Sequence, residues 1–231
     1  MLIILAKQED EIAAWLAHRW QSHNAVLVSA ADLSTSGWSL HLASPGKSRA
    51  CVGGRDIRNE EINGVVTRIP RVGSEDLEHI VSSDRRYVAA EMTAFLLAWL
   101  SSLACPVLNR PTPSCLGGPI WRDEEWVHLA SRLGIPVMPV RRKTPDDVPL
   151  PEVESACAVT VVGEACLGNA AEPLIKNARK LAKAAGTDLL SVRFTGSEAD
   201  SAFVSASVWP NLSSPETADT VLQCLLEKSV C

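Results

Sequence analysis

The sequence predicts an α/β protein with two domains, a parallel-sheet domain over residues 1–140 and a small α+β domain over 156–231. Two observations favour this class. Residues 1–30 run strand, helix, strand, and such a βαβ unit places its strands parallel in one sheet. The second part runs strand, helix, strand, strand, helix, in which two successive strands pair as a hairpin. Residues 141–155 are charged and rich in proline, without apolar periodicity, so we interpret them as a linker.

Apolar runs and helix signals define the elements of the first domain. MLIIL at 1–5 is typical of a buried parallel strand, and the acidic residues 9–11 open a helix because carboxylates favour a first turn. The further predicted elements are strands in AVLVSA (25–30), INGVVTRIP (62–70) and PVLNRP (106–111), helices over 84–104 and 122–134, an extended segment IPVMPV (135–140), turns in SPGKSRACVGGRD (44–56) and a loop over 112–119.

The second domain is predicted from an amphipathic helix and a hairpin. An apolar stripe runs along residues 171–185, and Gly186 ends that helix. The other predicted elements are one strand in ACAVTVVGEA (156–165), paired strands in DLLSVRF (188–194) and AFVSASVW (202–209), and a final helix that starts at Ser214-Pro215.

The strand at 202–209 alternates in a way that bears on function. Period-two geometry predicts Phe203, Ser205, Ser207 and Trp209 on one face and the intervening apolar residues on the other. We expect Trp209 either to fill space on its face by apolar contact or to be exposed to a partner.

Composition excludes several classes of protein. A net charge of −5 with no long basic stripe does not favour a nucleic-acid partner. Seven cysteines without a CxxC pair suit free thiols in a reducing cytosol, and no Cys or His falls at zinc-ligand spacing. The first residues lack signal-peptide features, and we interpret the apolar segment 87–105 as a buried helix rather than a membrane span. We therefore expect a cytoplasmic protein that binds neither nucleic acid nor membrane.

Polar residues at predicted strand ends are the candidate ligand contacts. Arg68 and Arg71 follow one strand, and Asn109 and Arg110 end another, at the edge where open α/β sheets bind ligands. A guanidinium fork suits carboxylate or phosphate, although surface salt bridges and a plain turn explain the same residues. We find no phosphate loop, dinucleotide fingerprint, nucleophile elbow or zinc-protease motif, and His18, His23 and His79 lie in polar surroundings that predict exposure to solvent.

The order of elements resembles the ATP-grasp superfamily, particularly the branch of glutathione synthetase and the peptide-tailoring glutamate ligases. In residues 1–140 the resemblance depends on Arg68 with Arg71, on Glu91 in the long helix and on Asn109-Arg-Pro. In the second half it depends on VTVVGEACLGNAAEPLIKNARKLAKAAGTDLLSVRF and FVSASVWPNLSS. The resemblance implies a Rossmann-like pre-ATP-grasp domain followed by the last part of an ATP-grasp catalytic domain.

Two departures from that family bear on activity. The resemblance places an Asp, a Glu and an Asn, which bind the magnesium ions of ATP, at the positions of Arg193, Ser207 and Trp209, and these offer no carboxylate. The family also inserts a subdomain that covers the nucleotide, where this chain has only the linker 141–155. Since phosphoryl transfer depends on positioning and charge neutralisation, we expect no metal, no cofactor and no catalytic residue.

These departures predict a non-catalytic accessory, binding or scaffold subunit with a protein or peptide partner, in peptide modification or another biosynthetic pathway. The seven tryptophans and a former domain interface favour a homodimer. Two alternatives stay open. One is a ligase completed in trans by a partner chain. The other is an enzyme of unrecognised chemistry in the crevice of Arg68, Arg71 and Asn109, with Cys115 or Cys166 as the nucleophile.

Overall fold

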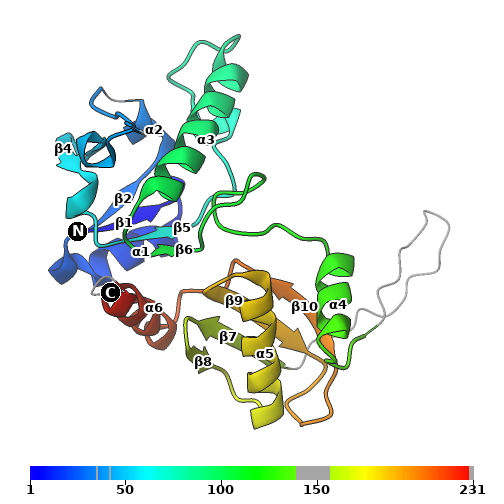
Figure 1. Cartoon of the computed structure of the whole chain (residues 1–231). Coiled ribbons are helices and arrows are strands. Elements are labelled where there is room, and N and C mark those ends of the chain that lie inside the picture. The colour runs from blue at the N-terminus through cyan, green and yellow to red at the C-terminus, as the bar shows by residue number, and fades with distance from the viewer. Residues whose placement is uncertain (35, 42, 139–156, 229–231) are drawn as a thin grey trace. The chain divides into compact units, whose positions relative to one another are not determined.

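Two sheets of different kinds organise the computed structural model, which describes residues 1–34, 36–41, 43–138 and 157–228 (Figure 1). A parallel sheet belongs to unit one, Met1–Gly118 with the segment that begins at Asn211, and an antiparallel sheet belongs to unit two, Pro119–Pro210. The predicted linker 141–155 lies outside the described residues. The mixed α/β class predicted from the sequence is confirmed.

The parallel sheet of unit one has the strand order β2-β1-β5-β6. Its strands are β1 (Leu2–Leu5), β2 (Ala25–Val28), β5 (Gly64–Thr67) and β6 (Val107–Leu108). Helix α1 (Glu11–Arg19) connects β1 to β2, so the predicted βαβ unit is present. Every residue of β1 and β5 is buried, as expected for central strands of a parallel sheet covered on both faces.

Helices cover both faces of that sheet. On one face, Leu5 and Val65 pack in a cluster with Trp99 of helix α3 (Arg85–Ser102). On the other face, helix α6 (Pro215–Lys228) packs so closely on β5 that a Cβ added at Gly64 would lie 3.0 Å from Leu225 Cδ2. None of the helices that the structure describes is long and apolar enough to cross a bilayer, and α3 packs on the sheet as the sequence predicts.

A second, small sheet in unit one corrects the prediction of turns over 44–56. Strands β3 (Arg49–Val52) and β4 (Arg55–Arg58) form a hairpin. Gly53 and Gly54 connect them with φ angles of 56° and 74°, which suit the tight turn that joins two twisted strands. The remaining short elements of unit one are α2 (Ala30–Leu33) and 3₁₀ turns at Gln21–His23, Pro45–Lys47, Asn59–Glu61 and Ser74–Asp76.

Unit two is an antiparallel sheet covered on one face by two helices. The strand order is β10-β9-β7-β8, from β7 (Cys157–Val162), β8 (Ala165–Leu167), β9 (Leu189–Phe194) and β10 (Phe203–Ser207). Helices α4 (Asp123–Arg132) and α5 (Glu172–Ala185) bury Trp126 and Leu181 against this sheet. The predicted helix 171–185 and the hairpin of β9 and β10 are confirmed, whereas the single strand predicted at 156–165 is a hairpin that turns at Gly163.

Two helices belong to different units from those that the sequence analysis assigned. Helix α4 contacts β10 of unit two, although the sequence analysis placed it in the first domain. Helix α6 contacts β5 of unit one, although it is the last element of the chain. An amphipathic helix needs an apolar partner surface, and local periodicity does not identify which sheet provides it.

Candidate functional site

A crevice of about 490 Å³ lies at the carboxyl ends of strands β1 and β2 in unit one. The chain leaves β1 toward β2 on one side and returns to β5 on the other, so the strand order reverses beside β1. Such a switch point separates two loops and leaves a space in which α/β proteins bind ligands. The lining residues are Ala6, Lys7, Gln8, Glu9, Ser29, Ala30, Ala31, Ile69, Glu75, Asp76, Glu78 and His79.

Acidic side chains dominate the charge of this crevice. Lys7 Nζ lies 3.1 Å from Asp76 Oδ1 and 3.4 Å from Glu75 Oε1. The hydrogen bond to Asp76 raises the pKa of Lys7, with burial acting in the opposite direction. Since Glu9 and Glu78 also line the crevice, its carboxylates outnumber its lysine. The crevice therefore suits a cationic or hydrogen-bonding group better than a phosphate.

The residues of this crevice are not predicted from the sequence to form a site. The sequence predicts only a helix start for the acidic residues 9–11 and exposure to solvent for His79. His79 is indeed exposed, and its Nε2 lies 2.7 Å from Ser34 Oγ. The available signal was the loop AKQED directly after the first strand, because loops at that edge line the ligand site of an open sheet.

Arg68 forms an internal ion pair and does not line the crevice. Its Nε donates to Asp10 Oδ2 at 2.8 Å, and both side chains are less than one-fifth exposed. Asp10 is also the N-cap of α1, where its Oδ1 accepts the backbone N–H of Ala13. Arg71 is exposed. A backbone hydrogen bond and Lys7 lower the pKa of the Glu75 carboxyl, and the charge of Arg71 adds to this in a minor way. Arg68 therefore joins β5 to the start of α1.

The Asp10–Arg68 pair predicts a stability change at acid pH. Burial raises the pKa of Asp10, but hydrogen bonds from Arg68 and Ala13 outweigh it, so the folded-state pKa lies below 3.8. The carboxylate then stabilises the fold above about pH 4, and this contribution disappears as the pH falls through the folded-state pKa. We expect Asp10→Asn to cost about 1–2 kcal/mol at pH 7, because asparagine still caps the helix while Arg68 loses a charged partner.

Urea denaturation from pH 7 to pH 2.5 measures this effect, and the difference between wild type and Asp10→Asn should shrink progressively as the pH falls below about 4. Asp219→Asn is the matched control, because Asp219 pairs with Arg19 in the same fork geometry but is 58% exposed. Its effect should be smaller because solvent screens the pair. A constant difference at every pH would contradict the proposed role of the Asp10 charge.

Asn109 and Arg110 also make contacts within unit one. Asn109 is 2% exposed, and its Nδ2 donates to the carbonyl of Gly117 at 3.4 Å. The Arg110 guanidinium donates to the carbonyls of Leu100, Leu103 and Cys105 at 2.9–3.2 Å. Arg110 thus satisfies backbone oxygens at and beyond the end of α3, where a cation also interacts well with the helix dipole.

The face of the unit-two sheet that points away from the helices, which we call the open face, carries two of the three positions that the resemblance relates to metal binding. Ser205 lies opposite Arg193 and Ser207 opposite Ser191, so Arg193 and Ser207 share the face that points away from the helices. Both are exposed. Among the described strand residues on this face, none is Asp or Glu; they are Ala158, Thr160, Val162, Ala165, Leu167, Leu189, Ser191, Arg193, Ser205 and Ser207.

A β-bulge corrects the predicted alternation of β10. The register shifts between Phe203 and Ser205, so Phe203 lies in the core with Ala206 rather than beside Ser205 and Ser207. Trp209 is half-buried and packs against that core, and its backbone N–H donates to Ser207 Oγ at 3.1 Å. Within the described parts of the chain, no group of three or more His, Cys, Asp or Glu residues is arranged to hold a metal ion.

The two candidate nucleophilic thiols lie in surroundings that keep them protonated. Cys115 is buried, and burial raises its pKa despite an N–H donated to its Sγ by Gly117. Burial also raises the pKa of Cys166, although Arg179 acts in the opposite direction. A thiol is a much weaker nucleophile than its thiolate, so neither environment activates a cysteine.

Comparison with known proteins identifies the fold. No family model and no curated protein matches the sequence. The structure resembles the macrocyclase MdnC from Microcystis aeruginosa, crystallised with precursor peptide MdnA, with a TM-score of 0.67 and 12% identity over 98% of this chain and 99% of that chain.

Two further similar structures are ATP-grasp ligases. A RiPP-associated ATP-grasp ligase from Chryseobacterium gregarium, in complex with ADP and a leader and core peptide, gives a TM-score of 0.64 at 11% identity over 98% of this chain and 96% of that chain. The ligase PsnB, complexed with a phosphomimetic variant of its minimal precursor, Mg and ADP, gives a TM-score of 0.66 at 12% identity over 99% of this chain and 98% of that chain. The chain therefore has an ATP-grasp-like fold.

Proposed function

We propose that this protein is a non-catalytic, ATP-grasp-like peptide-binding subunit that acts as an accessory or scaffold in a peptide-modifying system. The observation that carries the proposal is the open face of the unit-two sheet, where Arg193 and Ser207 stand at two of the three positions that the family resemblance relates to magnesium. Magnesium requires oxygen ligands, usually carboxylates, and a guanidinium repels it. The third position, Trp209, offers no oxygen ligand from its side chain.

The length of the chain supports the same conclusion. Where the family resemblance implies a subdomain that covers the nucleotide, this chain has only residues 141–155 between its two predicted domains. A phosphoryl transfer enzyme needs both charge neutralisation and exclusion of water around its phosphates.

Peptide binding is the capacity that remains. The similar structures include MdnC bound with its precursor peptide and a ligase in complex with a leader and core peptide. We infer from these complexes that this fold can bind an extended peptide without a nucleotide site. The acidic crevice beside β1 adds a site that favours cationic and hydrogen-bonding groups over a triphosphate.

The competing enzyme hypothesis has less support. Arg68 and Arg110 bind groups of their own unit, and burial raises the pKa of both Cys115 and Cys166. A catalytic crevice would need side chains directed toward a substrate and a nucleophile in its reactive form.

Calorimetric titration with Mg-ATP tests the proposal. We expect no saturable binding, corresponding to a Kd weaker than about 1 mM. An active ATP-grasp ligase titrated in the same buffer serves as the positive control. Binding in the micromolar range, or ATP hydrolysis by the isolated chain, would overturn the non-catalytic assignment. Hydrolysis that starts only when a second ATP-grasp chain is added would instead support a site completed in trans.

A further inference from the structure

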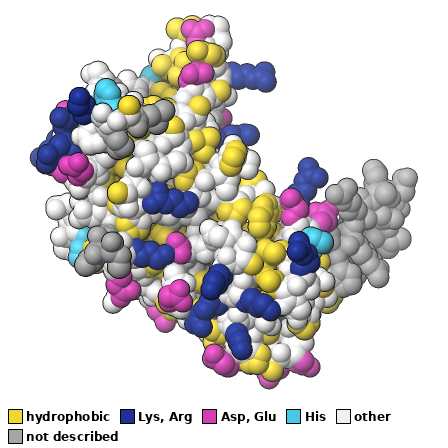
Figure 2. Space-filling view, viewed as in Figure 1, with side chains coloured by type: hydrophobic (Ala, Val, Ile, Leu, Met, Phe, Trp, Pro, Cys, Tyr) yellow, Lys and Arg dark blue, Asp and Glu magenta, His cyan; other side chains and the backbone are white. Residues whose placement is uncertain are grey.

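A shallow groove of about 440 Å³ runs along the solvent side of α4 in unit two. Its lining residues are Trp121, Glu124, Glu125, His128 and Leu129, which we call the Trp121 groove. Their spacing of three and four places them on one stripe of the helix, separate from Trp126 and Ala130, which are buried in the core. Figure 2 shows carboxylates and a histidine over α4, with basic side chains beside them. The stripe therefore combines an aromatic ring, a leucine and acidic groups at the surface.

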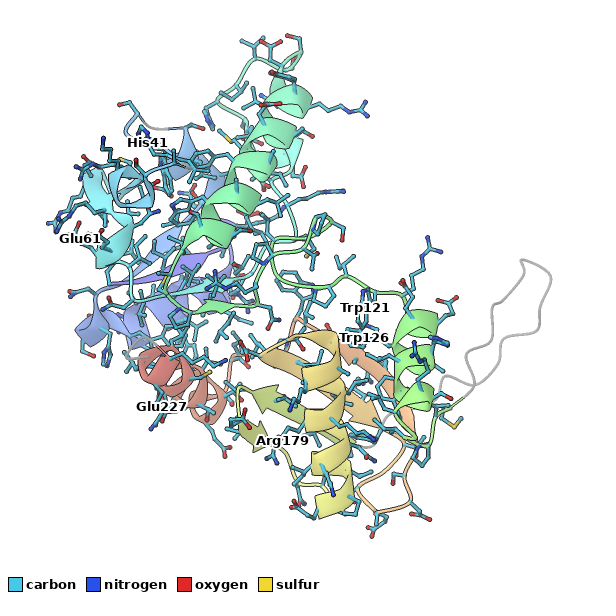
Figure 3. The ribbon with its side chains drawn as sticks, in the orientation of Figure 1. His41, Glu61, Trp121, Trp126, Arg179 and Glu227 are labelled. Carbon is cyan, nitrogen blue, oxygen red and sulfur yellow. The ribbon has the colours of Figure 1, made fainter. Side chains whose placement is uncertain are left out.

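The ring of Trp121 is exposed but held in place. It is 36% exposed, and its centroid lies 4.6 Å from that of Trp126, with 55° between the ring planes. Trp126 is 2% exposed, so the contact attaches Trp121 to the core (Figure 3). An aromatic ring that is fixed before binding loses little conformational entropy when a ligand contacts it. This arrangement is typical of a recognition residue rather than of a loose surface tryptophan.

The acidic side chains of the groove favour a positively charged ligand. Glu124 and Glu125 contribute two carboxylates, and the lining residues that the structure describes include no lysine or arginine. Glu125 Oε2 accepts the backbone N–H of Arg122 at 2.8 Å, which fixes this carboxylate at the start of the helix. Arg122 and Arg132 stand at the two ends of α4 and are exposed, but neither lines the groove. A cationic group above the ring would lie near both carboxylates.

We propose that the Trp121 groove binds a basic side chain, preferentially arginine, of the peptide partner; this inference rests on the proposed peptide-binding function. A planar guanidinium stacks on an indole face and forms fork-shaped hydrogen bonds with a carboxylate. The aliphatic part of the side chain packs against Leu129, which is half-buried. An acidic peptide would be repelled by Glu124 and Glu125. A purely apolar segment would bury the charge of Glu125 without a compensating cation, which costs free energy.

Titration with a short probe peptide, acetyl-Ala-Arg-Leu-Ala-amide, tests this inference through NMR shifts of the α4 amides. The matched probe carries citrulline, which keeps the shape of arginine and removes its charge. We expect the citrulline probe to bind about tenfold more weakly, since the charged hydrogen bonds and cation–π contact are lost. Trp121→Ala should remove the shifts of α4, and Glu125→Gln, which still caps the helix, should weaken binding about threefold to tenfold.

Tyr87→Ala is the control, because Tyr87 is 68% exposed on α3 of the other unit and should leave the arginine affinity unchanged. If Trp121→Ala does not fold, Glu125→Gln and the citrulline probe decide the question. Equal binding of the two probes, or equal binding by wild type and Glu125→Gln, would overturn the inference. Neither result depends on the Mg-ATP titration, so failure here and failure of the non-catalytic assignment are separate outcomes.

Discussion

Gly168→Ala is expected to unfold unit two at ordinary temperatures or to leave it only marginally stable. Gly168 has a φ angle of 133°, a backbone conformation that residues with a side chain rarely adopt. A Cβ at this position would lie 2.4 Å from the carbonyl oxygen of Ala158 and 3.3 Å from Val159 Cα. Strand β7 cannot move away, because it pairs with β8 on one side and β9 on the other. We expect a loss of more than about 3 kcal/mol.

Gly134→Ala is the matched control in the same unit. Gly134 also has a positive φ, 72°, but an added Cβ would meet no atom within 4 Å. Its substitution should lower the free energy of unfolding by only about 1–2 kcal/mol, the cost of placing a residue with a Cβ in the left-handed conformation. Thermal unfolding followed by circular dichroism, with amide exchange of β7 and β9, separates the two variants. Equal losses for Gly168→Ala and Gly134→Ala would show that the close approach to β7 contributes nothing.

Trp99→Ala is expected to destabilise unit one by about 3–5 kcal/mol, the usual cost of removing a fully buried aromatic ring. Trp99 is 0% exposed and meets Trp38 edge-on with 5.3 Å between ring centroids. Its Nε1 donates to Asn59 Oδ1 at 3.1 Å, so the substitution also leaves an amide oxygen without its donor. The cavity would lie between α3 and the sheet, at the centre of the cluster that joins them.

Urea denaturation of this variant should show a lower midpoint than that of Trp15→Ala. Trp15 is only half-buried, and its ring contacts Arg19, whose guanidinium carbon lies 5.5 Å from the ring centroid. A cation–π contact at such a site contributes about 0.5–1 kcal/mol. Comparable destabilisation by the two substitutions would contradict the central position of Trp99.

Local patterns predicted most of the secondary structure. Apolar runs identified β1, β2, β5 and the long helix α3, and helical spacing with signals at one helix end identified α1 and α5. The prediction was incomplete where geometry depends on one residue, as in the hairpin that turns at Gly53-Gly54 and the bulge after Phe203. A single added residue reverses the faces of a strand, and no periodicity reveals it.

Local sequence patterns predicted the candidate site less well than the secondary structure. The four candidate ligand contacts follow strands β5 and β6. Three of them, Arg68, Asn109 and Arg110, form hydrogen bonds with other groups of unit one. The crevice beside β1 and the Trp121 groove on α4 were not identified from the sequence. The predicted homodimer stays a prediction, which sedimentation of the purified chain can test.

The sequence by itself determined most of the elements and the chemical types of the side chains, including the cation and hydroxyl at positions 193 and 207. These follow from intervals of two to four residues and from residue identity. Only the tertiary structure decided which side chains meet, such as Asp10 with Arg68 at a separation of 58 residues, or α6 with β5. Such contacts depend on the packing of whole elements, and packing is a property of surfaces distant in sequence.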